Sequence, residues 1–100
     1  MPTILKYFGF TFFFYSHDHF PVHVHVEHGE YESIFELIFE DGKLTEIKHR
    51  KSAGIEQLPS KLMKEAIKVI EIECNYISES WFNYFVKNIT PKIKTISKKI

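Results

Sequence analysis

The chain has 100 residues, the size of a single domain, and with 44% hydrophobic and 16% aromatic residues it can bury a modest core. Its 13 basic and 13 acidic residues cancel, but residues 87–100 hold five lysines and no acid, which leaves a charge of −5 on residues 1–86. An acidic body argues against a broad nucleic-acid-binding surface, and no apolar run is long enough to span a membrane.

Apolar and polar residues alternate along the first half of the chain, which is the pattern of β-strands. The strand-like runs are 7–15, 22–27, 32–40 and 44–49. Between the last two runs, Asp41-Gly42 matches a two-residue hairpin turn and would place Glu40 opposite Lys43. The sequence therefore predicts four strands in a mostly antiparallel sheet, the first of them rich in aromatic residues and covered on both faces.

The second half of the chain predicts a long helix, because apolar residues recur at spacings of three and four from Pro59 to Phe85. A helix of about 26 residues would span about 39 Å, longer than the strands, so we expect it to break around residues 75–80 or to overhang the sheet. A second apolar row, which includes Val69 and Ile72, allows a homodimer or another partner contact. The predicted fold is α+β: a four-stranded, mostly antiparallel sheet followed by one long or broken helix packed on one face.

The predicted domain ends at residue 86, and residues 87–100 form a basic C-terminal extension. Thr90-Pro91 matches a helix cap followed by a first-turn proline, and the isoleucines after it follow a loose helical period among lysines. The usual role of such a tail is a solvated extension. We expect it to be frayed alone, to become ordered on contact, and to offer three isoleucines to a partner protein: Ile93, Ile96 and Ile100.

Histidines are concentrated in one short segment, since five of the six lie within residues 17–28. Three valines alternate there with His23 and His25, so a strand would direct the valines into the core and both imidazoles to the opposite, less buried face. Side chains two apart on a strand lie about 7 Å apart and can converge on one phosphate, one metal ion or one acidic partner.

A metal site would need a third ligand beside His23 and His25, and four residues could supply it: His17, Asp18, His19 and Glu27. No further spaced pair of ligands supports such a site, so the sequence assigns no metal and no cofactor. A small histidine-based metal-binding protein remains one alternative. The plainest alternative is a polar strand face whose histidines are satisfied by neighbouring glutamates.

Paired histidines also suit metal-independent RNA cleavage, in which a neutral imidazole takes the 2′-hydroxyl proton and a protonated one donates to the leaving oxygen. His23 and His25 are therefore candidate catalytic residues. Cations around the phosphate could come from one basic run if it lies near the histidine face: Lys48, His49, Arg50 and Lys51. These four are candidate nucleic-acid-binding residues, although such a run is more often a solvated strand end.

Nothing in the sequence indicates export. Cys74 is the only cysteine, which excludes an intramolecular disulfide and favours a reducing compartment. The N-terminal residues lack the charged start and continuous apolar run of a signal peptide. We expect a cytoplasmic protein without a membrane partner.

Four features together resemble one small bacterial family. They are the start Met1-Pro2-Thr3-Ile4, the aromatic run Phe12-Phe13-Phe14-Tyr15-Ser16, the motif Pro21-x-His23-x-His25-Val26 and the helix end Trp81-Phe82-Asn83-Tyr84-Phe85. The family is catalogued as domain of unknown function four-one-six-zero, and the resemblance covers roughly residues 1–86. It implies a compact α+β fold, any functional site at His23 and His25, and a neighbouring gene in an arrangement like that of toxin–antitoxin modules. The basic tail departs from the family pattern.

The sequence leaves two main functional hypotheses. The favoured one is a component of a toxin–antitoxin-like two-gene module that binds or cleaves RNA through the paired histidines, with RNA and the neighbouring gene's protein as partners. The alternative is a non-enzymatic interaction protein, in which the helix and the tail bind a partner and the histidines are structural. The sequence does not decide between an enzyme and a binding protein.

Overall fold

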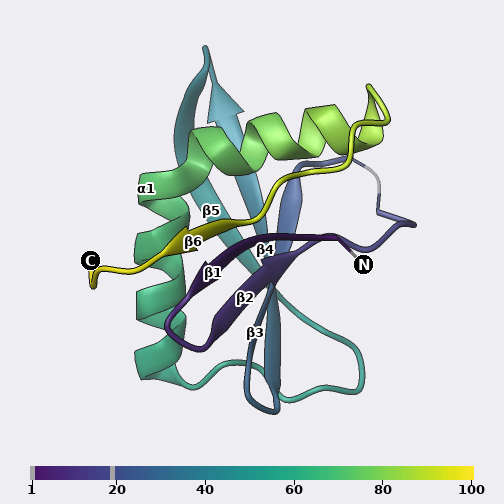
Figure 1. The fold of residues 1–100 in the computed structure, drawn as a ribbon. Coiled ribbons are helices and arrows are strands. Elements are labelled where there is room, and N and C mark those ends of the chain that lie inside the picture. Colours follow the sequence, from purple (N-terminus) through teal and green to yellow (C-terminus); the bar gives the residue numbers. More distant parts are fainter. Residues whose placement is uncertain (1, 19) are drawn as a thin grey trace.

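In a computed structural model that describes residues 2–18 and 20–100, the chain forms a twisted six-stranded sheet and one long helix (Figure 1). The elements in chain order are β1 (Thr3–Tyr7), β2 (Phe10–Phe13), β3 (His23–His28), β4 (Tyr31–Glu40), β5 (Lys43–Lys51), α1 (Ser60–Phe85) and β6 (Lys94–Ile96). The strand order is β5-β4-β3-β2-β1-β6, antiparallel except for the parallel pair β1 and β6. The α+β class with one helix and a mostly antiparallel sheet is confirmed, but the prediction of four strands is wrong.

One of the two additional strands is β1, which lies mostly before the predicted strand over 7–15 and forms a hairpin with β2 inside that run. The turn of this hairpin lies at Phe8 and Gly9, whose φ angles are 36° and 87°. The turn pairs Tyr7 with Phe10 and places both rings in the core. The alternating pattern of side chains continues through this turn, and Phe-Gly lacks the Asn-Gly or Asp-Gly signal of common two-residue hairpins. The sequence pattern therefore did not predict the turn.

The hairpin predicted at Asp41-Gly42 is confirmed. Both residues have positive φ angles, 52° and 79°, and Glu40 pairs with Lys43. Turn chemistry and burial pattern agree there, so a local signal was sufficient to set the register.

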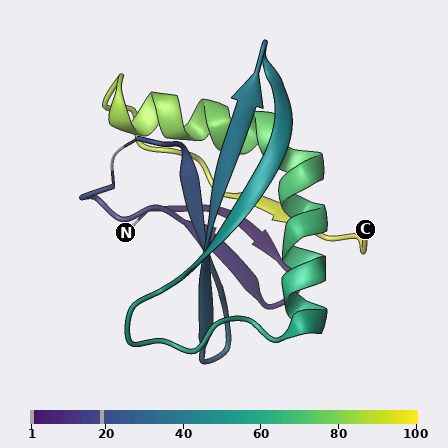
Figure 2. The same ribbon diagram turned by 180° about the vertical axis from the view of Figure 1, so that it is seen from behind.

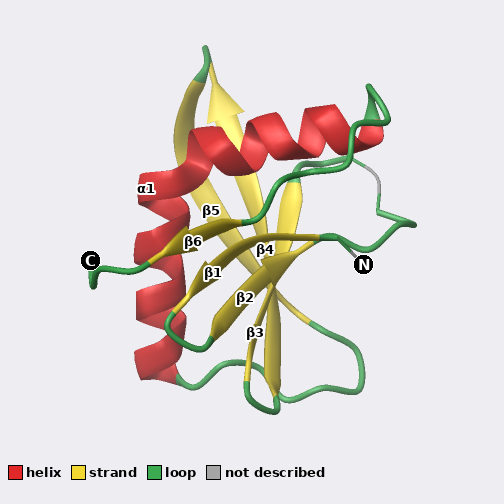
Figure 3. Cartoon of the chain, viewed as in Figure 1, coloured by secondary structure: helices red, strands yellow, loops and turns green. Residues whose placement is uncertain are grey.

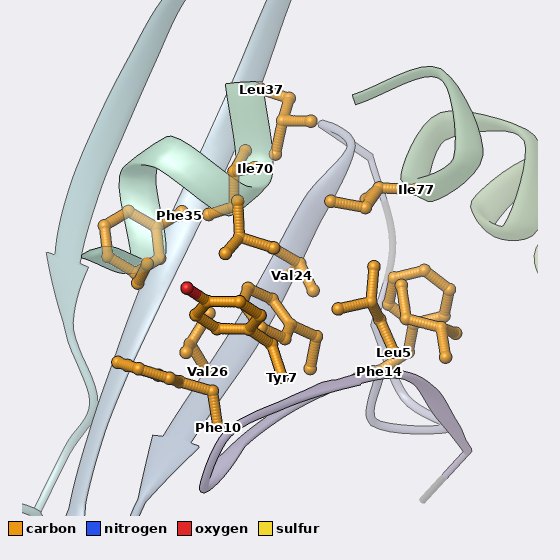
Figure 4. Close-up of a cluster of buried hydrophobic side chains, with 14 of the residues drawn as sticks. Leu5, Tyr7, Phe10, Phe14, Val24, Val26, Phe35, Leu37, Ile70 and Ile77 are labelled. Carbon is orange, nitrogen blue, oxygen red and sulfur yellow. The ribbon is translucent and has the colours of Figure 1, made fainter. Parts of the chain in front are cut away.

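The main core lies between the sheet and α1, which passes in front of the β4–β5 hairpin in Figure 1 and behind it in the opposite view of Figure 2. Side chains from the strands and the helix interdigitate there (Figure 4). The core includes Ile4, Leu5, Tyr7, Phe10, Phe12, Phe14, Val24, Val26, Phe35, Leu37, Ala66, Val69, Ile70, Ile77 and Trp81. Val69 of the second apolar row is therefore core, whereas Ile72 is 58% exposed.

Helix α1 bends at Glu73, where the backbone leaves helical geometry with φ −101° and ψ 16°. The two arms run at a large angle to each other (Figure 3). The bend lies just before the predicted region of 75–80, and it lets both Ile70 and Ile77 reach the core. Within the described ranges, no helix is long and apolar enough to cross a membrane.

The basic tail supplies the other additional strand, and its predicted helical character is wrong. Lys94–Ile96 pairs in parallel with β1, and Lys94 Nζ lies 2.7 Å from Glu73 Oε1 at the helix bend. Strand β1 would otherwise present unpaired N–H and C=O groups at the sheet edge, and an extended tail satisfies them. Ile96 packs against the core, while Ile93 and Ile100 are 54% and 44% exposed.

Replacing Gly9 with Ala should lower the free energy of unfolding by about 1–3 kcal/mol, because φ is positive and the new Cβ would lie 2.9 Å from His28 Nε2. The His28 ring would have to move off Phe10, which it contacts at a centroid distance of 4.6 Å. Gly54→Ala is the control, since φ is 77° there and no atom lies within 4 Å of the added Cβ. Urea unfolding should show a larger loss for Gly9→Ala, and equal losses would contradict the close contact.

Candidate metal centre

Strand β3 places His23 and His25 on the side opposite Val24 and Val26, as the alternation predicted. The histidine side is more buried than predicted, since His23 and His25 are each only 5% exposed. The Phe13 ring stacks on His25 with centroids 5.4 Å apart, and Trp81 lies 4.9 Å from the His23 ring. Neighbouring strands and the helix end therefore shield a face that alternation alone would leave to solvent.

Asp18 lies over this face and joins the two imidazoles. Its Oδ1 is 3.2 Å from His23 Nε2, and its Oδ2 is 3.2 Å from His25 Nε2. The Tyr15 N–H donates to Asp18 Oδ2 at 2.8 Å, and the Asp18 N–H donates to the Tyr15 carbonyl at 3.0 Å. Asp18, His23 and His25, called the histidine cluster below, can each point one ligand atom into a group whose members lie within 4.8 Å of one another.

The proton on His23 can be assigned from its neighbours. Nδ1 lies 2.7 Å from the Pro21 carbonyl oxygen, which can only accept, so Nδ1 carries a hydrogen. In a neutral ring, Nε2 then has a bare lone pair, and this lone pair faces the carboxylate of Asp18. Two acceptors at 3.2 Å require a proton between them, on Nε2 or on the carboxyl group, or a metal ion.

In His25, the ring nitrogen that faces away from Asp18 lacks a hydrogen-bond partner among the described residues. This nitrogen is the buried Nδ1, and it lies 3.6 Å from Glu32 Oε2. If Nε2 carried the only proton, bare Nδ1 would face a second carboxylate. If Nε2 bound a metal ion, Nδ1 would carry the proton and direct it toward Glu32. Burial lowers the pKa of His25, while the Asp18 carboxylate acts in the opposite direction.

Glu32 is a buried carboxylate behind His25, only 3% exposed. The Ser52 hydroxyl donates to its Oε2 at 2.9 Å, and the Tyr15 hydroxyl lies 3.4 Å from both carboxylate oxygens. Burial, together with the charge of Glu32, raises the pKa of Tyr15. Hydrogen bonds thus hold the Glu32 carboxylate in place, and this carboxylate lies where the Nδ1 proton of a metal-bound His25 would point.

A pocket of about 330 Å³ opens beside the cluster and is called the histidine pocket here. Its lining residues are His17, Asp18, Phe20, Pro21, His23, His25, Ile34, Glu36 and Arg50. Of the candidate third ligands, Asp18 joins the cluster. His17 and Glu27 are not part of it, and His19 lies outside the described residues. An ion at the cluster would therefore have space on one side for water or a ligand.

The predicted basic run is divided between the two faces of β5. Lys48 pairs with Glu36 and Arg50 with Ile34, which places both on the histidine side. Arg50 also lines the histidine pocket, where its Nε lies 2.7 Å from Glu36 Oε1.

The other two members of the run lie on the opposite face. His49 contacts the core ring of Phe35 at a centroid distance of 5.6 Å, and burial lowers its pKa. Lys51, two residues further along β5, lies on the same face as His49 and pairs with Ser33. The structure thus brings one residue of the basic run, Arg50, into the pocket with the paired histidines.

Sequence reasoning missed Glu32 and Glu36, and a usable signal for them was present. Both alternate onto one face of the run over 32–40, and only Gly29-Glu30 separates β4, which contains this run, from β3. A connection this short predicts a hairpin, and hairpin pairing would have set both carboxylates beside the histidine face.

The fold and the site define a small α+β protein with a two-histidine, one-carboxylate cluster beside an open pocket. A family model described as domain of unknown function (DUF4160) matches residues 9–82, and the chain belongs to this family. The resemblance seen in the sequence is thereby confirmed, and the matched range contains the whole histidine cluster. No curated protein and no solved structure matches the chain.

Proposed function

We propose that this protein binds one divalent transition-metal ion at the histidine cluster and acts through the open pocket beside it. The observation that carries the proposal is the hydrogen bond from His23 Nδ1 to the Pro21 carbonyl, which leaves the Nε2 lone pair facing Asp18. Metal-binding histidines usually donate the other ring N–H to a carbonyl or a carboxylate, which fixes the ring orientation. Glu32 offers His25 the same support.

The ligand set suits a reactive centre better than a closed structural one. Two imidazoles and one carboxylate bind iron(II) in many oxygenases and zinc in several hydrolases, and three protein ligands leave positions for water and substrate. A bound divalent ion can lower the pKa of a coordinated water toward 7 or polarise a coordinated oxygen. The histidine pocket provides the space in which such chemistry would occur.

A structural ion pair is the competing interpretation. A proton on His23 Nε2 would also satisfy its contact with Asp18, and the imidazolium would then stabilise the loop that carries Asp18. This interpretation needs two protons on the His25 ring to match both Asp18 and Glu32, whereas metal binding at both Nε2 atoms leaves one proton on each ring, at Nδ1, with an acceptor oxygen on its side.

RNA binding or cleavage in a cytoplasmic, toxin–antitoxin-like two-gene module is a second candidate function. One observation favours it: Arg50 lines the same pocket as His23 and His25, so a phosphate there could contact a guanidinium and the histidine face together. Against direct acid–base catalysis, both Nε2 atoms are occupied by Asp18. In this module the exposed Ile93 and Ile100 of the tail would offer apolar contacts to the neighbouring gene's protein.

Metal binding is the first test of the proposal. Protein made without a histidine tag should carry about one equivalent of zinc, iron, cobalt or nickel by elemental analysis. After chelation, it should rebind one equivalent of Zn²⁺ in a calorimetric titration. His23→Ala, His25→Ala and Asp18→Asn should each lose this binding, because each removes one ligand of a three-ligand site. His17→Ala, a change at an exposed histidine beside Asp18, should keep it. A folded wild type that binds no metal would leave the ion pair as the correct interpretation.

Glu32→Gln tests the support of His25. The substitution keeps the shape and removes the charge toward which Nδ1 points, so Zn²⁺ affinity should fall about 10–100-fold while the stoichiometry stays at one. Glu36→Gln is the matched control, since that carboxylate lines the pocket but pairs with Arg50. Competition with a chromophoric chelator measures both affinities. Equal affinities for the two variants would remove Glu32 from the metal centre.

The RNA function predicts a toxicity phenotype. Expression of the wild type alone should arrest host growth and degrade or sequester RNA, and co-expression of the neighbouring gene should suppress the effect. The His23→Ala/His25→Ala double variant should be harmless, because it removes the candidate catalytic pair. Growth curves and RNA integrity provide the readout. Normal growth with the wild type, or toxicity that persists in the double variant, would exclude this function for the histidines.

A further inference from the structure

We infer that the histidine pocket binds the phosphate group of a phosphate ester, held between the bound metal ion and Arg50. The inference rests on the proposed metal centre and names the ligand for which the pocket is built. It follows from the position of Arg50, from the free donors of its guanidinium, from the charge of the pocket and from the pocket's size.

Sheet register brings Arg50 to the cluster. His25, Ile34 and Arg50 are lateral neighbours across β3, β4 and β5, and all three line the histidine pocket. Glu36 is the lateral neighbour of His23, and its Oε1 lies 2.7 Å from Arg50 Nε. This ion pair directs the guanidinium along β4 toward the row that contains His23.

The guanidinium retains donors for a ligand. Arginine has five N–H donors, the ion pair with Glu36 is made at Nε, and the terminal nitrogens have no hydrogen bond within the described residues. In the described part of the chain, no other side chain pairs with Arg50, whose side chain is 49% exposed. Two terminal nitrogens with parallel N–H bonds match the oxygens of a phosphate group, the geometry in which arginine recognises this group in proteins.

The charge of the pocket makes phosphate binding depend on the metal ion. Without a metal ion, the proton that His23 and Asp18 need between them brings the two carboxylates and one guanidinium of the lining to a net charge of 0, which does not attract an anion. A divalent ion that replaces this proton changes the charge to +1. The metal-loaded protein is therefore expected to bind phosphate, and the metal-free protein is not.

The size and lining of the pocket indicate an ester and not the free ion. Its volume of about 330 Å³ exceeds that of one phosphate group, and Phe20, Pro21 and Ile34 supply apolar lining beside the charged residues. The Phe20 residue is 59% exposed and offers an aromatic surface to the organic part of the ligand. A nucleoside monophosphate has both required parts, a phosphate and a flat ring.

The test uses the full chain loaded with Co²⁺, whose visible absorption reports the ligands of the metal. Inorganic phosphate should change the spectrum of the wild type in a saturable way, and uridine monophosphate should do so at lower concentration. Arg50→Gln should bind Co²⁺ as tightly as the wild type but weaken phosphate binding about 10–100-fold, the loss of a charge-assisted contact. Lys43→Gln removes one positive charge from the far end of β5 and should leave phosphate binding unchanged.

The outcomes separate this inference from the metal centre itself. Co²⁺ binding with a spectrum that phosphate does not change, or with equal phosphate affinity in Arg50→Gln and wild type, overturns the ligand and leaves the metal centre standing. Calorimetric binding of phosphate to the metal-free protein with unchanged affinity overturns the role of the metal ion in phosphate binding. Failure to bind Co²⁺, Zn²⁺ or any other divalent ion overturns both proposals. A uridine monophosphate affinity no higher than that of phosphate overturns the ester.

Discussion

The contact of one carboxylate with two imidazoles is the interaction on which the functional site depends. Asp18 reaches both His23 and His25 because β3 holds the two rings on one side of the strand and the loop before β3 folds back over them. The tight turn between Tyr15 and Asp18 fixes the carboxylate. A proton between these groups makes the cluster a structural ion pair, whereas a divalent ion would engage all three side chains at once.

The central position of β3 explains why the site is buried and yet supported on both sides. Phe13 of strand β2 and Tyr15, two residues beyond the end of this strand, supply the aromatic rings that cover His25. Strand β4 supplies Glu32 behind His25 and Glu36 beside His23. A pair of histidines on an edge strand would have had only one such neighbour. The valines on the other side of β3 tie this arrangement to the main core, so the geometry of the site and the stability of the fold share the same strand.

The interpretation of the C-terminal tail changes once its strand is known. The sequence predicted a solvated tail that is frayed alone and becomes ordered on contact, but Lys94–Ile96 completes the sheet and Lys94 pairs with Glu73 at the bend of α1. A partner would therefore meet an ordered edge that carries the exposed Ile93 and Ile100. This location is separate from the histidine pocket, since none of the tail residues lines it.

The sequence by itself determined the features that depend on neighbours along the chain. The turn at Asp41-Gly42, the long helix ending at Phe85 and the opposite placement of valines and histidines on β3 all follow from local spacing. The tertiary structure decided which strands meet and therefore which charges meet. Loop closure brings Asp18 to both histidines, and strand pairing brings Glu32 to His25 and Arg50 to the same pocket. The tail reaches β1 across most of the chain. Residue spacing encodes which face a side chain occupies, but pairing between distant segments depends on the free energy of the whole fold.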